Sequence, residues 1–572
     1  MKKILLGLTL LCTGLYHQLL AELCCTGKST CSITDNSQTV PPPCDTCTRC
    51  TEEACIDVCC PECCDLTCPS NCFVYGKTYL APRSQSRDTA RWLTGTGGYQ
   101  LITEIPDCFS IRALFTAEYQ QTFRGDRTAI YFLPTCCNSV RLGPDRTLIN
   151  DLDAADLVDV RADDFGLVTD NDPLDIAFTF TATVSSTVCI NPRIQNYIFD
   201  AYFVYDFTPV CAGVTGYLDI PVVLTRVSTN CTAEGCLFYQ DFAECDMDVE
   251  ETPAATQDPI AAFEGDFGWG LCNSRLCYGK ICPCKTQTAV AVADLRAGIG
   301  YQYHGNWWYA GLQFVAAAPT GTRAQARTLI EPTVGNGGSW EVGGRIDLGG
   351  MCWENNCNSV GVYLLAEVTH LFNSRVQTRL MDLTNNGPWS RYLLLKKFGV
   401  EGTVLEGLER GANVFATDMK VSTNVQGDGS LLLQWTHNGT QLGIGYNGWG
   451  RSRENITQLR STIPLNTYGI KGIVFVCDDD ELITASLSTI NTTEGIDGED
   501  DGADPVFLTS DDLDINSAQS PGTFSNSVFF SVGTTLDIPM APYIGLGGKL
   551  EIGHSNTAWS QWSVWAQLSV TL

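Results

Sequence analysis

Charged residues are scarce in this 572-residue chain. Asp, Glu, Lys and Arg together make up 17% of the sequence, against roughly 25% in a typical soluble domain. Basic residues are scarcer than acidic ones, with 35 Lys and Arg against 64 Asp and Glu, so the formal net charge is -29. A protein that binds nucleic acid must neutralise phosphates, which this charge would repel. Nucleic acid is therefore excluded as a partner.

Long apolar runs are also missing. No stretch beyond the N-terminus reaches the roughly 20 consecutive apolar residues that a membrane-spanning helix needs. The N-terminus begins with Lys2 and Lys3 and has an apolar core from Ile4 onward, which is typical of an export signal. We expect residues 1–21 to be a signal peptide that is cleaved near Ala21, so that the mature chain is exported. The alternative is an uncleaved anchor, which the short apolar run disfavours.

Histidine is rare, with five in the chain, and the common catalytic motifs are missing. No GxSxG, HExxH or GxxxxGK[ST] string occurs, so the chain lacks these signatures of nucleophilic, zinc and phosphate chemistry. Gly443, Gly445 and Gly448 fit GxGxxG, but they lie within an alternating segment that continues into Trp449. A dinucleotide site needs that motif at a strand-to-helix turn. We predict that the protein is not an enzyme and has no catalytic residues and no cofactor.

Cysteine is abundant: there are 29, and 28 remain once Cys12 leaves with the signal. Thirteen of them lie between Cys24 and Cys72. Their CxxC spacing could hold zinc or serve redox chemistry in a reducing compartment, but export favours disulfides. We predict that residues 22–75 form a cysteine-rich segment without a metal, either stapled by disulfides or disordered, because it has too few apolar residues for a core. The predicted disulfide cysteines are Cys44, Cys47, Cys50, Cys59, Cys60, Cys63, Cys64, Cys68 and Cys72.

The second half of the chain alternates between apolar and polar residues in segments of roughly ten residues, a period typical of barrel strands. Leu295 and Tyr303, for example, share one face, whereas Asp294 and Arg296 share the other. A soluble β-sandwich would alternate too. Here, however, the apolar faces end in Trp or Tyr, as in the aromatic girdles of membrane barrels. We predict an all-β fold: an antiparallel transmembrane β-barrel of roughly 12–16 strands within residues 76–572.

The chain ends inside such a segment, WSVWAQLSVTL, in which Trp562, Val564 and Val570 share one face with the final Leu572. This ending resembles the C-terminal strand of Gram-negative outer-membrane proteins, although the last residue there is usually aromatic. The alternation and the many cysteines together resemble the cysteine-bearing major outer-membrane porins of the chlamydia type over residues 110–572. The resemblance implies a place in the bacterial outer membrane. The expected partners are its lipid, the barrel-assembly machinery, and either further copies of the chain or disulfide-linked envelope proteins.

Two acidic stretches, residues 151–175 and 478–514, are predicted to be loops of the barrel. The spacing that starts at Asp497 imitates an EF-hand loop. Leu508 occupies the position where that loop needs a bidentate Glu, so we expect solvated charges there rather than a calcium site.

We predict a porin-like channel, in which the polar faces of the strands line a lumen for passive diffusion of small solutes. One alternative is a structural or adhesive envelope protein cross-linked by disulfides. Another is an extracellular all-β binding protein. The predicted pore-lining residues are Asp294, Arg296, Glu341, Arg345, Asp347, Lys549 and Glu551.

Overall fold

The computed structural model describes residues 74–96, 110–135, 137–143, 160–161, 183–207, 211–238, 259–266, 274–355, 357–398, 405–459, 463–470, 476–478, 481–483, 507–538, 540–554 and 559–572. All of them belong to one of the chain's two compact units, which spans Asp57–Leu572. The predicted signal peptide, the nine predicted disulfide cysteines and most of both acidic stretches lie outside the described residues. No described helix is both long enough and apolar enough to cross a membrane.

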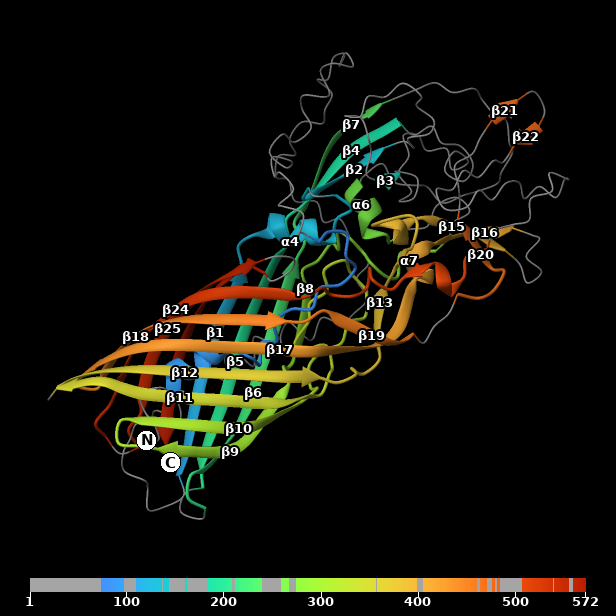
Figure 1. The fold of residues 1–572 in the computed structure, drawn as a ribbon. Coiled ribbons are helices and arrows are strands. Elements are labelled where there is room, and N and C mark those ends of the chain that lie inside the picture. Colours follow the sequence, from blue (N-terminus) through green and yellow to red (C-terminus); the bar gives the residue numbers. More distant parts are fainter. Residues whose placement is uncertain are drawn as a thin grey trace, which may run out of the picture. The chain divides into compact units, whose positions relative to one another are not determined.

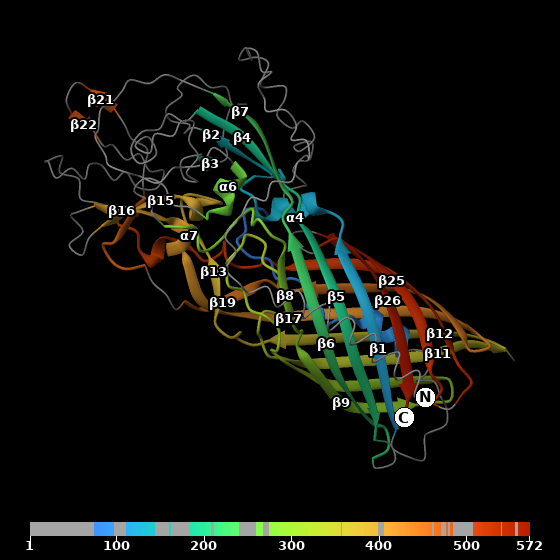
Figure 2. The ribbon, with the colours of Figure 1, turned by 180° about the vertical axis from the view of Figure 1, so that it is seen from behind.

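Twelve antiparallel strands form the wall of a barrel (Figures 1 and 2). These strands are β1 (Ser110–Thr122), β5 (Arg193–Asp206), β6 (Val214–Ser228), β9 (Leu295–His304), β10 (Trp308–Ala318), β11 (Glu341–Asn355), β12 (Asn358–Leu371), β17 (Ala416–His437), β18 (Thr440–Arg451), β24 (Thr523–Thr535), β25 (Tyr543–His554) and β26 (Gln561–Thr571). Their order is β12-β11-β10-β9-β6-β5-β1-β26-β25-β24-β18-β17, and pairing of β17 with β12 closes the ring. The prediction of an all-β antiparallel barrel is therefore confirmed, with a strand number at the lower end of the expected range.

The predicted alternation decides which side of the wall each residue faces. In β9, Ile299 is 57% exposed, whereas Arg296 is fully buried. In β26, Val564 is exposed and its neighbour Trp565 is buried. Because successive side chains of a strand point to opposite faces, the barrel has an apolar outer face and an inner face on which charged and polar residues are mixed with aromatic ones. Outward-facing apolar residues include Ile299, Tyr301, Leu312, Phe314, Leu431, Leu433, Ile444, Val528, Phe530, Ile544, Leu546 and Val564.

Short turns gather at one end of the barrel. They join β5 to β6, β9 to β10, β11 to β12, β17 to β18 and β24 to β25. The turn between β17 and β18 is Asn438-Gly439, with φ values of 47° and 80°, as a two-residue type I′ hairpin requires. The C-terminus lies at the same end, because Leu572 pairs with Ile111 at the start of β1. The opposite end carries the long connections, a difference that in bacterial barrels separates periplasmic turns from extracellular loops.

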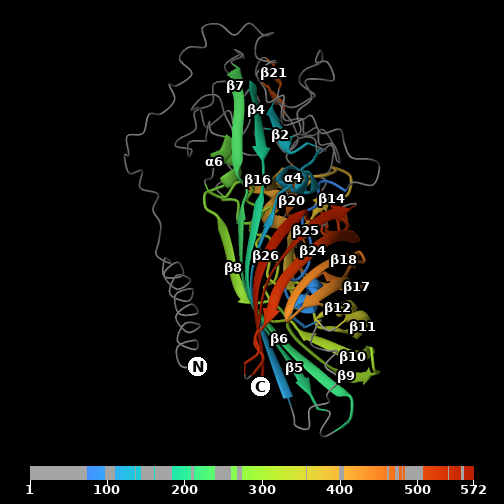
Figure 3. The same ribbon diagram turned by 90° about the vertical axis from the view of Figure 1, so that its left-hand side faces the viewer.

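Smaller elements follow the wall strands at the end with the long connections. Three sheets are formed by β3-β2-β4-β7, by β16-β15-β20 and by β14-β23, and β21 pairs with β22. In Figure 3, β2, β4 and β7 lie side by side. A disulfide joins Cys231 to Cys282, with a Cα–Cα distance of 6.0 Å. A core that includes Phe132, Ile190 and Phe263 stabilises this region.

The bounds of these elements complete the fold. The helices are α4 (Gly125–Phe132), α6 (Pro259–Glu264), α7 (Gly411–Val414), η4 (Ser390–Tyr392) and η5 (Ser510–Asp512). The strands are β2 (Ser139–Gly143), β3 (Val160–Arg161), β4 (Thr183–Ile190), β7 (Cys231–Phe238), β8 (Gln287–Val292), β13 (Gln377–Leu380), β14 (Asp382–Leu383), β15 (Leu394–Phe398), β16 (Leu405–Arg410), β19 (Glu454–Leu459), β20 (Tyr468–Ile470), β21 (Val476–Asp478), β22 (Glu481–Ile483) and β23 (Leu513–Asp514). Among them, β8 extends the wall beside β6, and β13 and β19 extend it beside β17.

Residues 74–96, which we call the plug and which are drawn in blue in Figure 1, begin beside α4, where the backbone N–H of Lys77 donates a hydrogen bond to the Tyr131 carbonyl, and continue into the barrel. The plug contains the helix α3 (Thr89–Thr96), whose eight residues are all buried. This helix contacts β12, β17, β18, β25 and β26. The first strand of the wall is therefore β1, and the plug that precedes it brings its helix into the interior.

A substitution on the outer face can test whether this face contacts lipid. Leu312 lies at the middle of β10 and is 65% exposed. If this face contacts lipid, Leu312→Arg should destabilise the barrel by about 2–4 kcal/mol, the cost of an arginine at the bilayer midplane. Reversible urea unfolding in lipid vesicles measures the change. Leu465→Arg, at a 79% exposed position outside the strands, is the matched control and should change the free energy of unfolding little. Equal effects of the two substitutions would contradict a lipid-facing wall.

Candidate channel interior

The plug is held in place by a helix cap and by three arginines. Asp88 accepts hydrogen bonds from the backbone N–H groups of Ala90 and Arg91, at 3.1 and 3.3 Å. These bonds satisfy donors that the first turn of a helix leaves free, so α3 begins directly after Asp88. Arg83, Arg87 and Arg91 follow one another at intervals of four residues, and each meets a different group of wall carboxylates.

Arg91 binds carboxylates of two adjacent strands. Its Nη1 lies 2.7 Å from Glu118 of β1, and its Nη2 lies 3.1 Å from Asp200 of β5. Asp219 of β6 is a diagonal neighbour of Asp200, since Tyr202 pairs with Asp219 in this register. All of these charged side chains are buried. The guanidinium group therefore neutralises part of a patch that contains three carboxylates.

Arg87 contributes to a four-membered ionic cluster. Its Nη2 lies 2.8 Å from Glu341 of β11 and 3.1 Å from Glu367 of β12. Arg296 of β9 pairs with the same two glutamates, at 2.9 Å from Glu341 and in close contact with Glu367. Two guanidinium groups thus face two carboxylates away from water. Such a cluster is costly to break by removing one partner, because an uncompensated buried charge remains.

Arg83 and Lys549 connect the plug to the other side of the wall. Arg83 lies 2.8 Å from Asp428 of β17 and 3.3 Å from Glu551 of β25. Lys549 of β25 pairs with Asp88, the residue that caps α3. The plug is therefore attached by ion pairs to strands on several sides of the barrel.

An aromatic cluster surrounds the helix beside these ion pairs. Trp92 of α3 stacks on Tyr202 with a centroid distance of 5.5 Å, and Tyr217 lies 5.4 Å from Tyr202. The guanidinium group of Arg345 lies 4.7 Å from the centre of the Tyr217 ring and 5.5 Å from the centre of the Trp92 ring. Its Nη1 also donates a hydrogen bond to the Tyr202 hydroxyl at 2.7 Å. These stacking and cation–π contacts fill the interior around the helix.

The seven predicted pore-lining residues all lie inside the barrel. Each is only 0–4% exposed. A small cavity beside the plug is lined by Lys549 and Glu551 together with Arg83 and Asp88. Arg296 and Glu341 share one ionic cluster, whereas Lys549 and Glu551 lie near Arg83. Asp294, just before β9, accepts a hydrogen bond from Ser84 of the plug at 2.7 Å. Their role in lining a path for solutes remains a prediction.

Sequence reasoning did not identify the plug as part of the interior. The missed plug residues are Arg83, Arg87 and Arg91, and the wall carboxylates that bind them include Glu118 and Asp200. One signal was present: three arginines at a spacing of four, in a chain with few basic residues. Alternation also placed Glu118 and Asp200 on strand faces, but no local pattern joined residues so far apart in sequence.

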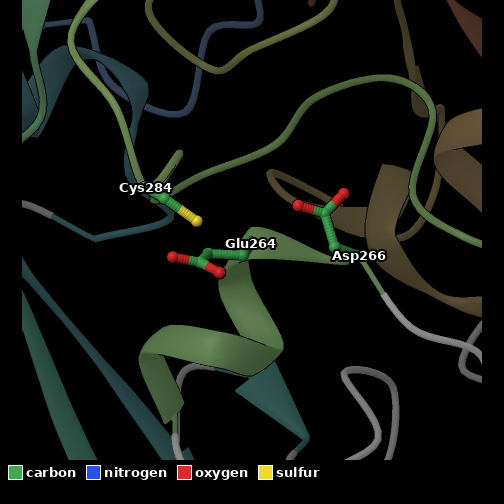
Figure 4. Close-up of side chains that lie close together, drawn as sticks. All are labelled: Glu264, Asp266 and Cys284. Carbon is green, nitrogen blue, oxygen red and sulfur yellow. The ribbon is translucent and has the colours of Figure 1, made fainter. Parts of the chain in front are cut away.

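Another group of polar side chains, Glu264, Asp266 and Cys284, lies outside the barrel interior (Figure 4). Their potential ligand atoms lie within 4.8 Å of one another. Asp266 pairs with Lys280. Burial, and a hydrogen bond and negative charge from Glu264, raise the pKa of the Cys284 thiol to about 11. A metal ion would need the thiolate, and the raised pKa disfavours that form.

The fold and its interior together define a closed β-barrel with an occupied lumen. The sequence matches no protein-family profile and no curated protein. Solved structures similar to this chain include an outer-membrane channel from Pseudomonas putida F1, with 10% identity, a TM-score of 0.32, and coverage of 82% of this chain and 97% of that chain. A deltaS2S3 mutant of the monoaromatic hydrocarbon channel TodX has 9% identity, a TM-score of 0.29, and coverage of 83% and 94%. A Pseudomonas aeruginosa FadL homologue has 8% identity, a TM-score of 0.26, and coverage of 81% and 89%.

At these identities and TM-scores, the three matches establish neither a shared fold nor a shared function. None of the three is a porin of the chlamydia type. The resemblance to those porins therefore remains a hypothesis from the sequence.

The ionic attachment of the plug can be tested against an exposed ion pair. Arg87→Met should lower the free energy of unfolding by about 3–5 kcal/mol, because Glu341 and Glu367 lose one of their two buried cations. Arg124→Met is the matched control: Arg124 and Asp126 pair at 3.3 Å with side chains 46% and 32% exposed, so its cost should be at most about 1 kcal/mol. Urea unfolding of the refolded barrel in vesicles measures both variants. A change no larger for Arg87→Met than for Arg124→Met would contradict the arrangement.

Proposed function

We propose that this protein is a channel of the bacterial outer membrane, closed by its plug in the arrangement described here, through which small polar solutes diffuse when the plug moves. The single observation that carries this proposal is a closed barrel that is apolar on its outside and has buried ion pairs on its inside. A segment of the same chain fills that inside without a covalent bond to the wall among the described residues.

The outer face supports a location in a membrane. Exposed apolar side chains recur on β9, β10, β11, β17, β18, β24, β25 and β26. Soluble monomers rarely expose one continuous apolar surface of this extent. Tyr303, Trp308, Trp353 and Trp435 are exposed near the end of the barrel with the short turns. Aromatic residues at such a level are typical of the bilayer interface.

The interior supports a channel rather than a solid structural barrel. A barrel built only for stability would favour apolar contacts, since well-packed apolar residues often stabilise as well as buried ion pairs do. Here the contacts between plug and wall combine an aromatic cluster with buried ion pairs, and water can replace the ionic partners once it enters. Displacement of the plug would therefore expose groups that are well solvated, and this supports a lumen that can open.

Planar-bilayer recordings test this function. The refolded chain should conduct rarely, and Arg83→Gln/Arg87→Gln/Arg91→Gln should conduct more often, because the substitutions remove the plug's three cationic attachments. Arg124→Gln, at an exposed ion pair, is the control and should leave conductance unchanged. A bilayer that stays sealed with the folded triple variant would contradict the channel.

A second candidate function, disulfide cross-linking in the envelope, rests on a separate observation. Cys211, Cys352 and Cys357 are exposed, carry free thiols and lie in or beside the short turns at one end of the barrel. In an oxidising compartment such as the periplasm or the cell surface, such thiols form disulfides. Non-reducing electrophoresis of the native envelope tests this role: ladders that collapse with reductant and weaken in Cys211→Ser/Cys352→Ser/Cys357→Ser are expected. A band at the monomer position with and without reductant would contradict it.

A further inference from the structure

The inner wall has twice as many buried carboxylates as buried cations. Among the described residues of the twelve wall strands, eight Asp and Glu side chains are buried, against four Arg and Lys side chains. The four cations are Arg296, Arg345, Arg451 and Lys549. The plug brings Arg83, Arg87 and Arg91 to this wall, so part of the compensating positive charge belongs to the plug and would leave with it.

The carboxylates are arranged as pairs that accept a guanidinium group. Glu118 and Asp200 hold Arg91, Glu341 and Glu367 hold Arg87, and Asp428 and Glu551 hold Arg83. Each pair comes from two different strands, so the wall creates the site when the strands assemble. Carboxylates match the planar donors of a guanidinium group in both charge and geometry.

A further carboxyl group lies beyond these pairs. Asp219 is fully buried and forms no ion pair with a cation among the described residues. It lies beside Asp200 on the inner face, in the patch that Arg91 enters. A buried carboxylate without a compensating cation is costly. A cation bound in this patch would find more negative charge than Arg91 alone compensates.

We infer that the opened channel selects cations, and that its permeant solutes are small organic cations that carry a guanidinium or ammonium group. This inference rests on the proposed channel function. The plug arginines occupy the positions that such solutes would take, and the three carboxylate pairs would serve as successive binding sites along the wall. Anions would meet an uncompensated negative wall, which raises the electrostatic barrier to their entry.

The experiment compares ion selectivity in planar bilayers formed with the full chain. Reversal potentials across a KCl gradient are measured for Arg83→Gln/Arg87→Gln/Arg91→Gln, and guanidinium chloride then replaces KCl on one side. We expect a several-fold preference for K⁺ over Cl⁻, together with measurable guanidinium permeation. Adding Glu118→Gln, Asp200→Asn and Asp219→Asn should reduce the cation preference. Adding Glu354→Gln, at an exposed position near the end of β11, is the control and should preserve it.

The outcomes separate the two proposals. Current without a preference for cations, or with a preference for Cl⁻, would overturn the selectivity inference and leave the channel intact. No current from any folded variant would overturn both. Should the triple variant fail to fold, Arg91→Gln and the rare openings of the unmodified chain are measured in the same way, since the wall carboxylates are unchanged in both.

Discussion

The structure depends on one constraint: apolar side chains at every second position of the wall face outward, whereas all of the buried charges of the wall strands face inward. A sheet with this pattern could bury its apolar face against a second layer, as in a β-sandwich, but here the apolar face is exposed and the other face is enclosed. Closing the sheet into a ring removes the free strand edges and pairs their backbone groups. The pairing of β17 with β12 completes that ring, and the enclosed polar face then creates the need for compensating charge.

The plug meets that need with residues from outside the wall. Arg91, for example, compensates carboxylates of β1 and β5, which are neighbours in the sheet although Glu118 and Asp200 are far apart in the sequence. Ion pairs of this kind contribute less net stability than their number suggests, because each charge loses its hydration on burial. These ion pairs fix the position of the plug helix, because the carboxylates that hold it lie on several sides of the wall.

Much of the wall could be predicted from the sequence, because its signal is local and periodic. Tyr301, Leu312 and Val564 face outward as the alternation predicts, and the seven predicted pore-lining residues all lie on the inner side. Strand number was less well determined, since it depends on how the strands close and not on any one segment.

The sequence by itself determined the strand period, the inward position of the charges and the apolar character of the outer face, since each follows from neighbouring residues. Only the tertiary structure decided that the lumen is filled, and by which residues. The contacts between Arg87 and Glu341, or between Asp88 and Lys549, join positions 254 and 461 residues apart. Charge complementarity over such separations has no period along the chain, so it becomes visible only after the wall has closed and brought those side chains together.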